Sequence, residues 1–176
     1  MKKILYLFAA VAIMVSCKNA ASTTAAKTDT AAMPYKAVYS NDIKFSDSTK
    51  NVRAVLQSLK DWEDNKLANA PAYFADTVAM DFWNGTSIKM KRDSLTLISQ
   101  KYRDSLASSK IEVAVHLNLH LNDKNEDWVC VWYKQIDTYK NGKVDSAEYQ
   151  DDNLLKNGKI VYVDDKRRTL KPAAKK

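Results

Sequence analysis

The hydrophobic and polar positions divide the chain into a helix-forming part and a later strand-forming part. From Ser48, apolar side chains recur at helical spacing, at Val52, Val55, Leu56, Leu59 and Trp62. This pattern predicts a first helix, with Asp47 or Ser48 as its N-cap. Residues 69–77, with Pro71 near the start, predict a short second helix. A third helix, capped by Asp93, is predicted from the spacing of Leu95, Ile98, Tyr102 and Leu106.

Glycine marks the turns of the strand-forming part. The chain has only three glycines, Gly85, Gly142 and Gly158, and each follows an asparagine. Asn-Gly accepts the positive φ that a two-residue hairpin turn requires at both positions. We therefore expect three hairpins. The last two help to build a four-stranded meander at 111–122, 127–139, 143–155 and 159–167.

This order of elements predicts an α+β domain in which helices cover one face of an antiparallel sheet. The segment "YFADTVAMDFWNG", the third helix and the closing "NLLKNGKIVYVDD" resemble the nuclear transport factor 2-like superfamily, nearest its SnoaL-like branch. The resemblance covers about 120 residues. It implies a cone: a strongly bent antiparallel sheet wrapped around about three N-terminal helices, with a pocket at the wide end. The family includes cyclases, an isomerase, an epoxide hydrolase and binding domains without activity. No catalytic set of the family matches position by position, so none is carried over.

Hairpin turns fix which side chains share a face of a sheet. A two-residue turn at Asn141-Gly142 would place Trp132 opposite Asp151. A second one at Asn157-Gly158 would place Asp151 opposite Asp164. We expect this face to meet the helices and to line the pocket, although a β-bulge would turn over every residue beyond it.

The expected pocket has aromatic walls and a few polar groups, as small-molecule sites do. Its candidate residues are Trp62, Phe74, Phe82, Trp132, Tyr149, Asp151, Tyr162 and Asp164, and Trp83 lies beside them in the sequence. Two carboxylates directly opposite each other repel, so a closed site would raise the pKa of one and suit it to acid–base work. The alternative is that Asp151 and Asp164 lie at the solvated end of the sheet and pair with Lys or Arg.

The opposite, outer face is expected to carry His116, Asn118, His120 and Tyr133. This face is expected either to be exposed to solvent or to form the interface of a homodimer. His116 and His120 are four residues apart. On a strand that spacing is about 13 Å, too far for one metal ion bound at roughly 2 Å per ligand. No metal site or other cofactor is therefore predicted.

The N-terminus predicts export and anchoring to a membrane. Lys2 and Lys3 precede an apolar stretch that ends in "MVSC" and resembles the lipobox of bacterial lipoproteins. We expect a signal peptide at 1–16, a lipid on Cys17 and an Ala/Thr/Ser-rich tether at 17–39. This places the protein in the cell envelope, facing the periplasm. The alternative is an ordinary cleaved signal with an incidental cysteine.

The charge of the chain lies at its ends. The formal net charge is +7, yet residues 40–165 hold 17 Lys and Arg against 20 Asp and Glu, a net charge of −3. The part of the domain at 40–165 is therefore mildly acidic. The domain as a whole is expected at 40–170, and a basic tail follows at 171–176. This distribution excludes a nucleic-acid-binding surface. Cys130, in the apolar run "DWVCVWYK", is expected to be a buried, inert thiol.

Two functions follow from these observations. The first is a non-catalytic module that binds a small apolar or amphipathic ligand or a protein partner. The second is a cyclase- or isomerase-type enzyme in which Asp151 or Asp164 transfers a proton. Binding is favoured because no histidine lies on the expected inner face and no nucleophile–base pair is visible.

Overall fold

In the computed structural model, which describes residues 33–170, a seven-stranded sheet forms the body of the domain that begins at Lys36. Its elements, in chain order, are β1 (Ile43–Phe45), α1 (Thr49–Glu63), the 3-10 helix η1 (Leu67–Ala72), β2 (Phe74–Asp81), β3 (Ser87–Lys91), α2 (Arg92–Asp104), β4 (Leu106–Leu121), β5 (Glu126–Tyr139), β6 (Val144–Lys156) and β7 (Lys159–Thr169). The predicted α+β class and order of helices and strands are confirmed. The short strand β1 was not predicted.

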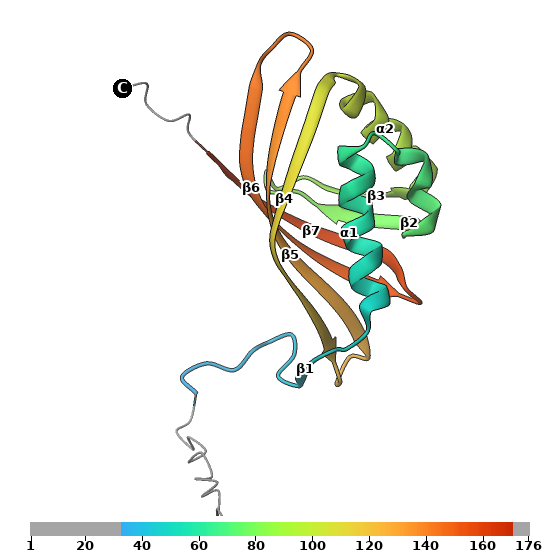
Figure 1. The fold of residues 1–176 in the computed structure, drawn as a ribbon. Helices are drawn as coiled ribbons and strands as arrows, with labels where there is room; N and C mark the ends of the chain where they lie inside the picture. Colours follow the sequence, from blue (N-terminus) through green and yellow to red (C-terminus); the bar gives the residue numbers. More distant parts are fainter. Residues whose placement is uncertain (1–32, 171–176) are drawn as a thin grey trace, which may run out of the picture. The chain divides into compact units, whose positions relative to one another are not determined.

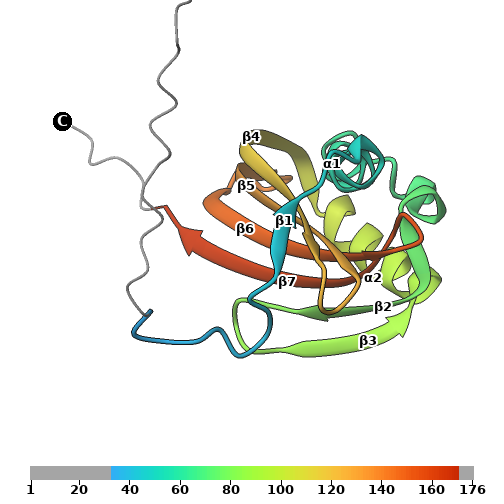
Figure 2. The same cartoon turned by 90° about the horizontal axis from the view of Figure 1, so that it is seen from below.

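The sheet is strongly curved and wraps around the helices. Its strand order is β1-β4-β5-β6-β7-β2-β3, and only the β2–β7 pair among the described strands is parallel. Viewed along the curve, β4 to β7 and the β2–β3 hairpin curl around α1 and α2 (Figure 1, Figure 2). This is the cone that the resemblance to the nuclear transport factor 2-like superfamily implied, with the helices on the concave side.

The helix boundaries follow local sequence, with two differences. Ser48 occupies the predicted N-cap of α1. The predicted second helix is a single 3-10 segment that ends at Ala72, and strand β2 begins where the helix was expected to continue. Helix α2 begins at Arg92, so Asp93 lies in its first turn rather than at its cap, where its charge still favours the helix dipole.

A buried arginine joins the two helices. Arg103, near the end of α2, donates from Nε to the carbonyl oxygen of Trp62 at 2.8 Å and from a terminal nitrogen to that of Glu63 at 2.9 Å. These carbonyls lie in the last turn of α1, where backbone acceptors commonly need partners from outside the helix. The Trp62 carbonyl also accepts from the Asn65 amide at 3.2 Å. The Arg103 contact fixes the end of α1 against α2 beside the cavity described below.

The turn between β5 and β6 is one residue longer than predicted. The Tyr139 amide donates to the Lys143 carbonyl at 2.8 Å, so the loop holds three residues. Gly142 has φ +82°, whereas Asn141 is not among the described residues with positive φ. The turn is therefore the three-residue kind with a single left-handed position. As a result Trp132 pairs with Gln150 and Tyr133 pairs with Tyr149, one residue away from the predicted register.

The β6–β7 turn has the predicted length, but a bulge follows it. Asn157 and Gly158 both have positive φ, and Lys156 pairs with Lys159 as expected. The register then shifts between Leu154 and Leu155. Beyond the shift Asp151 pairs with Asp165, not with Asp164 as predicted.

These changes exchange the predicted faces on β5 and on β7 beyond the bulge, whereas Tyr149 and Asp151 of β6 face inward as predicted. The core consists of Val55, Val129, Val131, Tyr133, Leu155, Ile160 and Val163. Trp132, which was predicted to meet the helices, alternates with the core residues of β5 and lies on the outer face together with Trp128 and Cys130. An alternating strand presents a side chain to each face in turn, so an error of one residue exchanges inside and outside.

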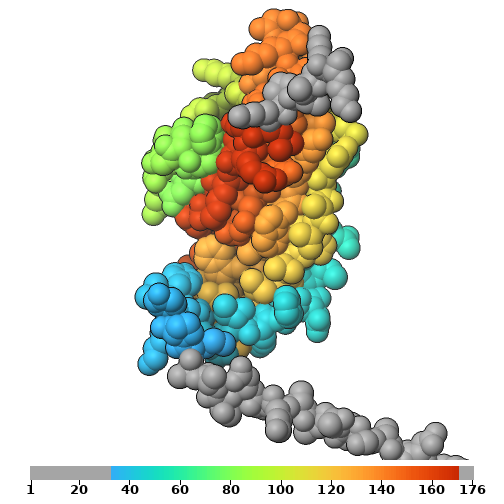
Figure 3. Space-filling model, turned by 90° about the vertical axis from the view of Figure 1, so that its left-hand side faces the viewer, coloured from blue at the N-terminus to red at the C-terminus, as the bar shows by residue number. Residues whose placement is uncertain are grey.

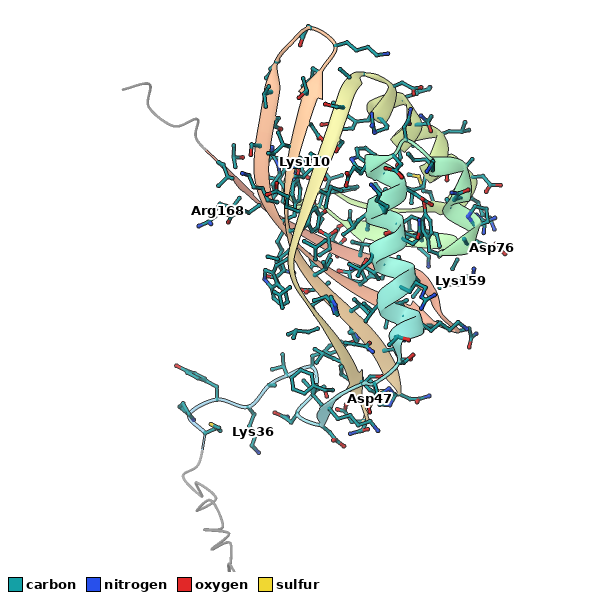
Figure 4. The ribbon with its side chains drawn as sticks, in the orientation of Figure 1. Lys36, Asp47, Asp76, Lys110, Lys159 and Arg168 are labelled. Carbon is teal, nitrogen blue, oxygen red and sulfur yellow. The ribbon has the colours of Figure 1, made fainter. Side chains whose placement is uncertain are left out.

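The outer face is formed by β4 to β7 and is partly covered by the segment before β1. Figure 3 shows β7 on this side, between the β2–β3 hairpin and β6. Arg168 of β7 projects away from α1 on this side (Figure 4) and forms an ion pair with Glu148. Tyr39 packs edge-on against Trp128, with ring centroids 6.3 Å apart, and donates to Glu126 at 2.7 Å.

Candidate functional site

A cavity of about 700 Å³ lies on the concave side of the sheet. Its walls come from α1, η1, the β2–β3 hairpin, α2 and the inner faces of β5, β6 and β7. Eight aromatic side chains line it: Trp62, Tyr73, Phe74, Phe82, Trp83, Tyr102, Tyr133 and Tyr149. Met80, Ile88 and Met90 complete an apolar wall, and a volume of this size accommodates a small organic molecule.

Three lining residues mark the opening of the cavity. Trp83, Ile98 and Tyr102 line the cavity and are also 55%, 56% and 45% exposed. Large apolar side chains that face both a cavity and solvent form its rim. The indole of Trp62 and the ring of Tyr102 stack beside this rim with centroids 5.8 Å apart.

Two carboxyl groups face each other on the cavity wall. Asp151 of β6 and Asp165 of β7 are directly opposite in the sheet. The Tyr133 hydroxyl donates to Oδ2 of Asp151 at 3.0 Å. Oδ1 of Asp151 and Oδ1 of Asp165 are buried and accept no hydrogen bond within the described residues. Burial and then the charge of Asp165 raise the pKa of Asp151 well above its ordinary value. Burial also raises the pKa of Asp165. The pair therefore favours a form that shares one proton.

A single guanidinium borders this pair. Arg167 of β7 donates to Oδ2 of Asp145 at 2.6 Å and to the Tyr149 hydroxyl at 3.0 Å. Its guanidinium carbon lies 5.2 Å from the centre of the Trp83 ring. Arg167 is thus held between two aromatic side chains and one carboxylate, which fixes its position on the wall.

A third carboxylate lies further along β5. Asp137 is buried and accepts hydrogen bonds from the Ser109 hydroxyl at 2.6 Å and from the Gln135 amide at 2.8 and 3.0 Å. The Trp62 indole N–H donates to Ser109 at 3.2 Å, which links this network to α1. The donors to Asp137 are neutral, so its negative charge is solvated without being cancelled.

The structure brings together five of the eight predicted pocket residues. Trp62, Phe74, Phe82, Tyr149 and Asp151 line the cavity, as does Trp83. The other three, Trp132, Tyr162 and Asp164, do not line it and lie on the outer face. Their placement changes because of the longer β5–β6 turn and the bulge near Leu154.

Polar contacts on the outer face account for these three side chains. Asp164 and Asp152 both pair with Lys166, at 2.8 and 2.6 Å. The Trp132 indole donates to Gln150 at 3.0 Å, and the Tyr162 hydroxyl donates to Asp81 at 2.6 Å. The alternative stated for Asp164, a carboxylate near solvent that pairs with a lysine, is the one that the structure shows.

The residues predicted for the outer face lie on the inner side of the sheet. His116 and Asn118 pair with the core residues Val131 and Val129 of β5. Tyr133 is a core residue and lines the cavity. Asn118 is buried and donates to the carbonyls of Ser46 and Ser48, at the start of α1. His120 contacts Asp127 through Nδ1 at 2.8 Å, and His116 is exposed on the same strand. Within residues 33–170 no three His, Cys, Asp or Glu side chains group as metal ligands do.

Sequence reasoning missed Asp165, Arg167, Asp137 and Tyr133. All four sit at odd-numbered positions of β5 and β7, in alternation with residues that it selected. A three-residue turn at 140–142 and a bulge in the final hairpin would have recovered them. The pattern "VDDKR" holds two adjacent aspartates, and only the bulge decides which one faces inward.

Comparisons with known proteins support this architecture. No protein-family profile matches the sequence, and no curated protein sequence matches it significantly. Among solved structures, a putative polyketide cyclase from Xanthomonas campestris is 17% identical, with a TM-score of 0.54 over 69% of this chain and 92% of the other. An NTF2-like protein of unknown function from Exiguobacterium is 14% identical, with a TM-score of 0.54 over 65% of this chain and 98% of the other.

The fold is that of the nuclear transport factor 2-like proteins. An LEH-like epoxide hydrolase from M. tuberculosis shares it at 10% identity, with a TM-score of 0.57 over 70% of this chain and 86% of the other. Identities this low establish the nuclear transport factor 2-like architecture and leave the chemistry to the residues in the cavity.

Proposed function

We propose that this protein binds a small, largely apolar molecule in the cavity of its cone. The observation that carries the proposal is the cavity itself, about 700 Å³ walled by aromatic and methionine side chains, with its charged groups on β5 to β7. A ligand that fills the cavity covers this wall and removes its apolar surface from water, which contributes about 25 cal/mol of binding free energy per Å². The polar groups on β5 to β7 then orient the bound molecule.

The test has two parts. Native mass spectrometry of the full-length protein purified from its own host should show a retained small molecule. Titration with the apolar fluorophore N-phenyl-1-naphthylamine should give saturable binding. A protein that retains nothing and does not bind the fluorophore contradicts the proposal.

A matched pair of variants on α2 locates the binding. Ser99 lines the cavity, whereas Leu97, two residues earlier, is exposed and does not. Ser99→Phe should fill part of the cavity and weaken fluorophore binding at least tenfold, while Leu97→Phe should bind as the unaltered protein does. Equal affinity of both variants would place the fluorophore elsewhere.

A second candidate function is proton transfer, and the Asp151–Asp165 pair favours it. A carboxyl pair that shares a proton inside an apolar cavity can donate to or accept from a bound molecule. An enzyme of this kind would exchange an acidic C–H of the retained molecule in deuterium oxide. Asp151→Asn should stop that exchange, and Asp164→Asn, on the outer face, should not. A retained molecule that gains no deuterium argues for binding alone.

The predicted lipid anchor lies on Cys17, outside the described residues. We propose it on the strength of the signal-like N-terminus alone. None of the helices in residues 33–170 is long and apolar enough to span a bilayer. Mass spectrometry of the mature N-terminus tests the anchor, since an unmodified amine on a residue other than Cys17 would contradict it.

The predicted homodimer through the outer face also stays a proposal. That face carries Trp132 and Leu117, both partly buried, and Val115, which is exposed. Light scattering of the domain measures its mass directly, and a Val115→Asp variant should return a dimer to a monomer.

A further inference from the structure

The charged groups on the cavity wall are strongly unbalanced. Among residues 33–170, four carboxyls line it, at Asp137, Asp145, Asp151 and Asp165, against the single guanidinium of Arg167, and no lysine or histidine of this part lines it. Arg167 pairs with Asp145. The other three carboxyls form no ion pair within the described part of the chain. The interior of the cone is therefore negative.

Apart from the proton that the pair itself shares, two oxygens on this wall have no hydrogen-bond donor among the described residues. Oδ1 of Asp151 and Oδ1 of Asp165 are buried without a partner among the described residues. A buried acceptor that receives no hydrogen bond lowers the stability of a protein by about 1–3 kcal/mol, and by more when the acceptor is charged. Burial and mutual repulsion raise the pKa of Asp151, which is the response of a carboxyl that lacks a nearby positive charge. A cationic donor placed here would satisfy both oxygens and let both groups ionise.

The rest of the wall suits the same kind of ligand. The faces of aromatic rings attract cations, with Trp and Tyr the best of them. Six of the eight rings on the wall are Trp or Tyr: Trp62, Tyr73, Trp83, Tyr102, Tyr133 and Tyr149. Arg167 already makes cation–π contacts with two of these rings. Its guanidinium carbon lies 5.2 Å from the centre of the Trp83 ring and 5.8 Å from that of Tyr149.

We propose that the ligand of this cavity is an organic cation: an amine whose ammonium group contacts the Asp151–Asp165 pair and whose apolar body lies on the aromatic wall. The proposal rests on the proposed function, because it names the class of molecule that the cavity binds. An anionic ligand would instead meet three unpaired carboxyls and a guanidinium already occupied by Asp145.

Three probes of the same size and different charge test it. 1-Naphthylmethylamine is cationic at pH 7, 1-naphthylmethanol is neutral and 1-naphthoate is anionic. Calorimetric titration of the protein, stripped of any retained ligand, should show the amine binding at least tenfold tighter than the alcohol. The naphthoate should bind more weakly than the alcohol. Raising the salt concentration should reduce the preference only modestly, since the pair is buried.

Variants assign the preference to the carboxyl pair. Asp151→Asn should reduce the ratio of amine to alcohol affinity to below threefold while the affinity for the alcohol, which reports an intact cavity, stays within twofold. Asp164→Asn removes a carboxylate of the same strand pair on the outer face, and the ratio should not change.

The outcomes separate the two proposals. Equal binding of amine and alcohol, or tighter binding of the naphthoate, overturns the cation preference and leaves the binding function standing. A preference that survives in Asp151→Asn also overturns the assignment. If none of the three probes binds, both proposals are contradicted.

Discussion

Replacing Asp151 by asparagine should make the protein more stable at neutral pH. The amide is close in shape to the protonated carboxyl. Its oxygen can accept from Tyr133, which is 3.0 Å from Oδ2 in the unaltered protein. Its nitrogen can donate to Asp165, whose buried Oδ1 has no partner within the described residues. The variant therefore keeps the contacts and removes the charge that burial opposes.

The size of the effect follows from the direction of the pKa shift. The folded state raises the pKa of Asp151, so it binds a proton that the unfolded chain releases above its ordinary pKa of about 3.9. The contribution of Asp151 to the free energy of unfolding is therefore greatest below about pH 4. It falls as pH rises toward the folded pKa, by at most about 1.4 kcal/mol per pH unit. Between pH 4 and pH 7 this amounts to no more than about 4 kcal/mol, and we expect a gain of about 1–3 kcal/mol in the variant.

Urea denaturation from pH 4 to pH 8 measures this difference directly. The stability of Asp151→Asn relative to the unaltered protein should rise with pH from about pH 4 and then level off. Asp164→Asn is the control. It loses a partly exposed contact with Lys166 and should change stability by less than about 1 kcal/mol throughout. A variant at Asp151 that is less stable at pH 7, or whose difference does not depend on pH, would refute the reasoning.

Three further predictions follow from the same structure. Tyr133→Phe leaves Asp151 without its hydroxyl donor, so it should cost about 1–3 kcal/mol of stability in urea denaturation and be rescued in part at low pH. Ile160→Ala removes a side chain that is 0% exposed and should cost about 2–5 kcal/mol, whereas Leu97→Ala, at 67% exposed, should cost less than about 0.5 kcal/mol. Burial raises the pKa of the Cys130 thiol to about 12, so iodoacetamide at pH 8 should alkylate it only after unfolding in urea, as mass spectrometry can follow.

The cavity illustrates how a short-range error spreads through a sheet. The alternation of apolar and polar residues in β5 and β6 can be recognised in the sequence, and so can the Asn-Gly turns. Asn141 is nevertheless not among the described residues with positive φ, and the turn holds one residue more than predicted. Asn-Gly is compatible with both turn lengths, and the energy that chooses between them comes from packing Val129, Val131 and Tyr133 against α1.

The carboxyl pair shows that the sequence alone also does not determine which residues meet in the cavity. The sequence drew attention to Asp151 because of its place on the strand, and that residue does line the cavity. Its partner depends on the register shift near Leu154, which leaves Asp165 facing inward and Asp164 facing the lysine on the outer surface. Adjacent identical residues carry no local signal that separates these roles.

The cone was implied by resemblance to the nuclear transport factor 2-like superfamily. By itself the sequence determined the helical spacing around Val55 and the four long strands. These follow from periodicity and turn residues, which act over a few positions. The tertiary structure alone decided which face of the sheet is inside, because a strand offers two faces and only the helices packed against it make one of them the core. The cavity, its negative wall and the paired carboxyls all follow from that choice.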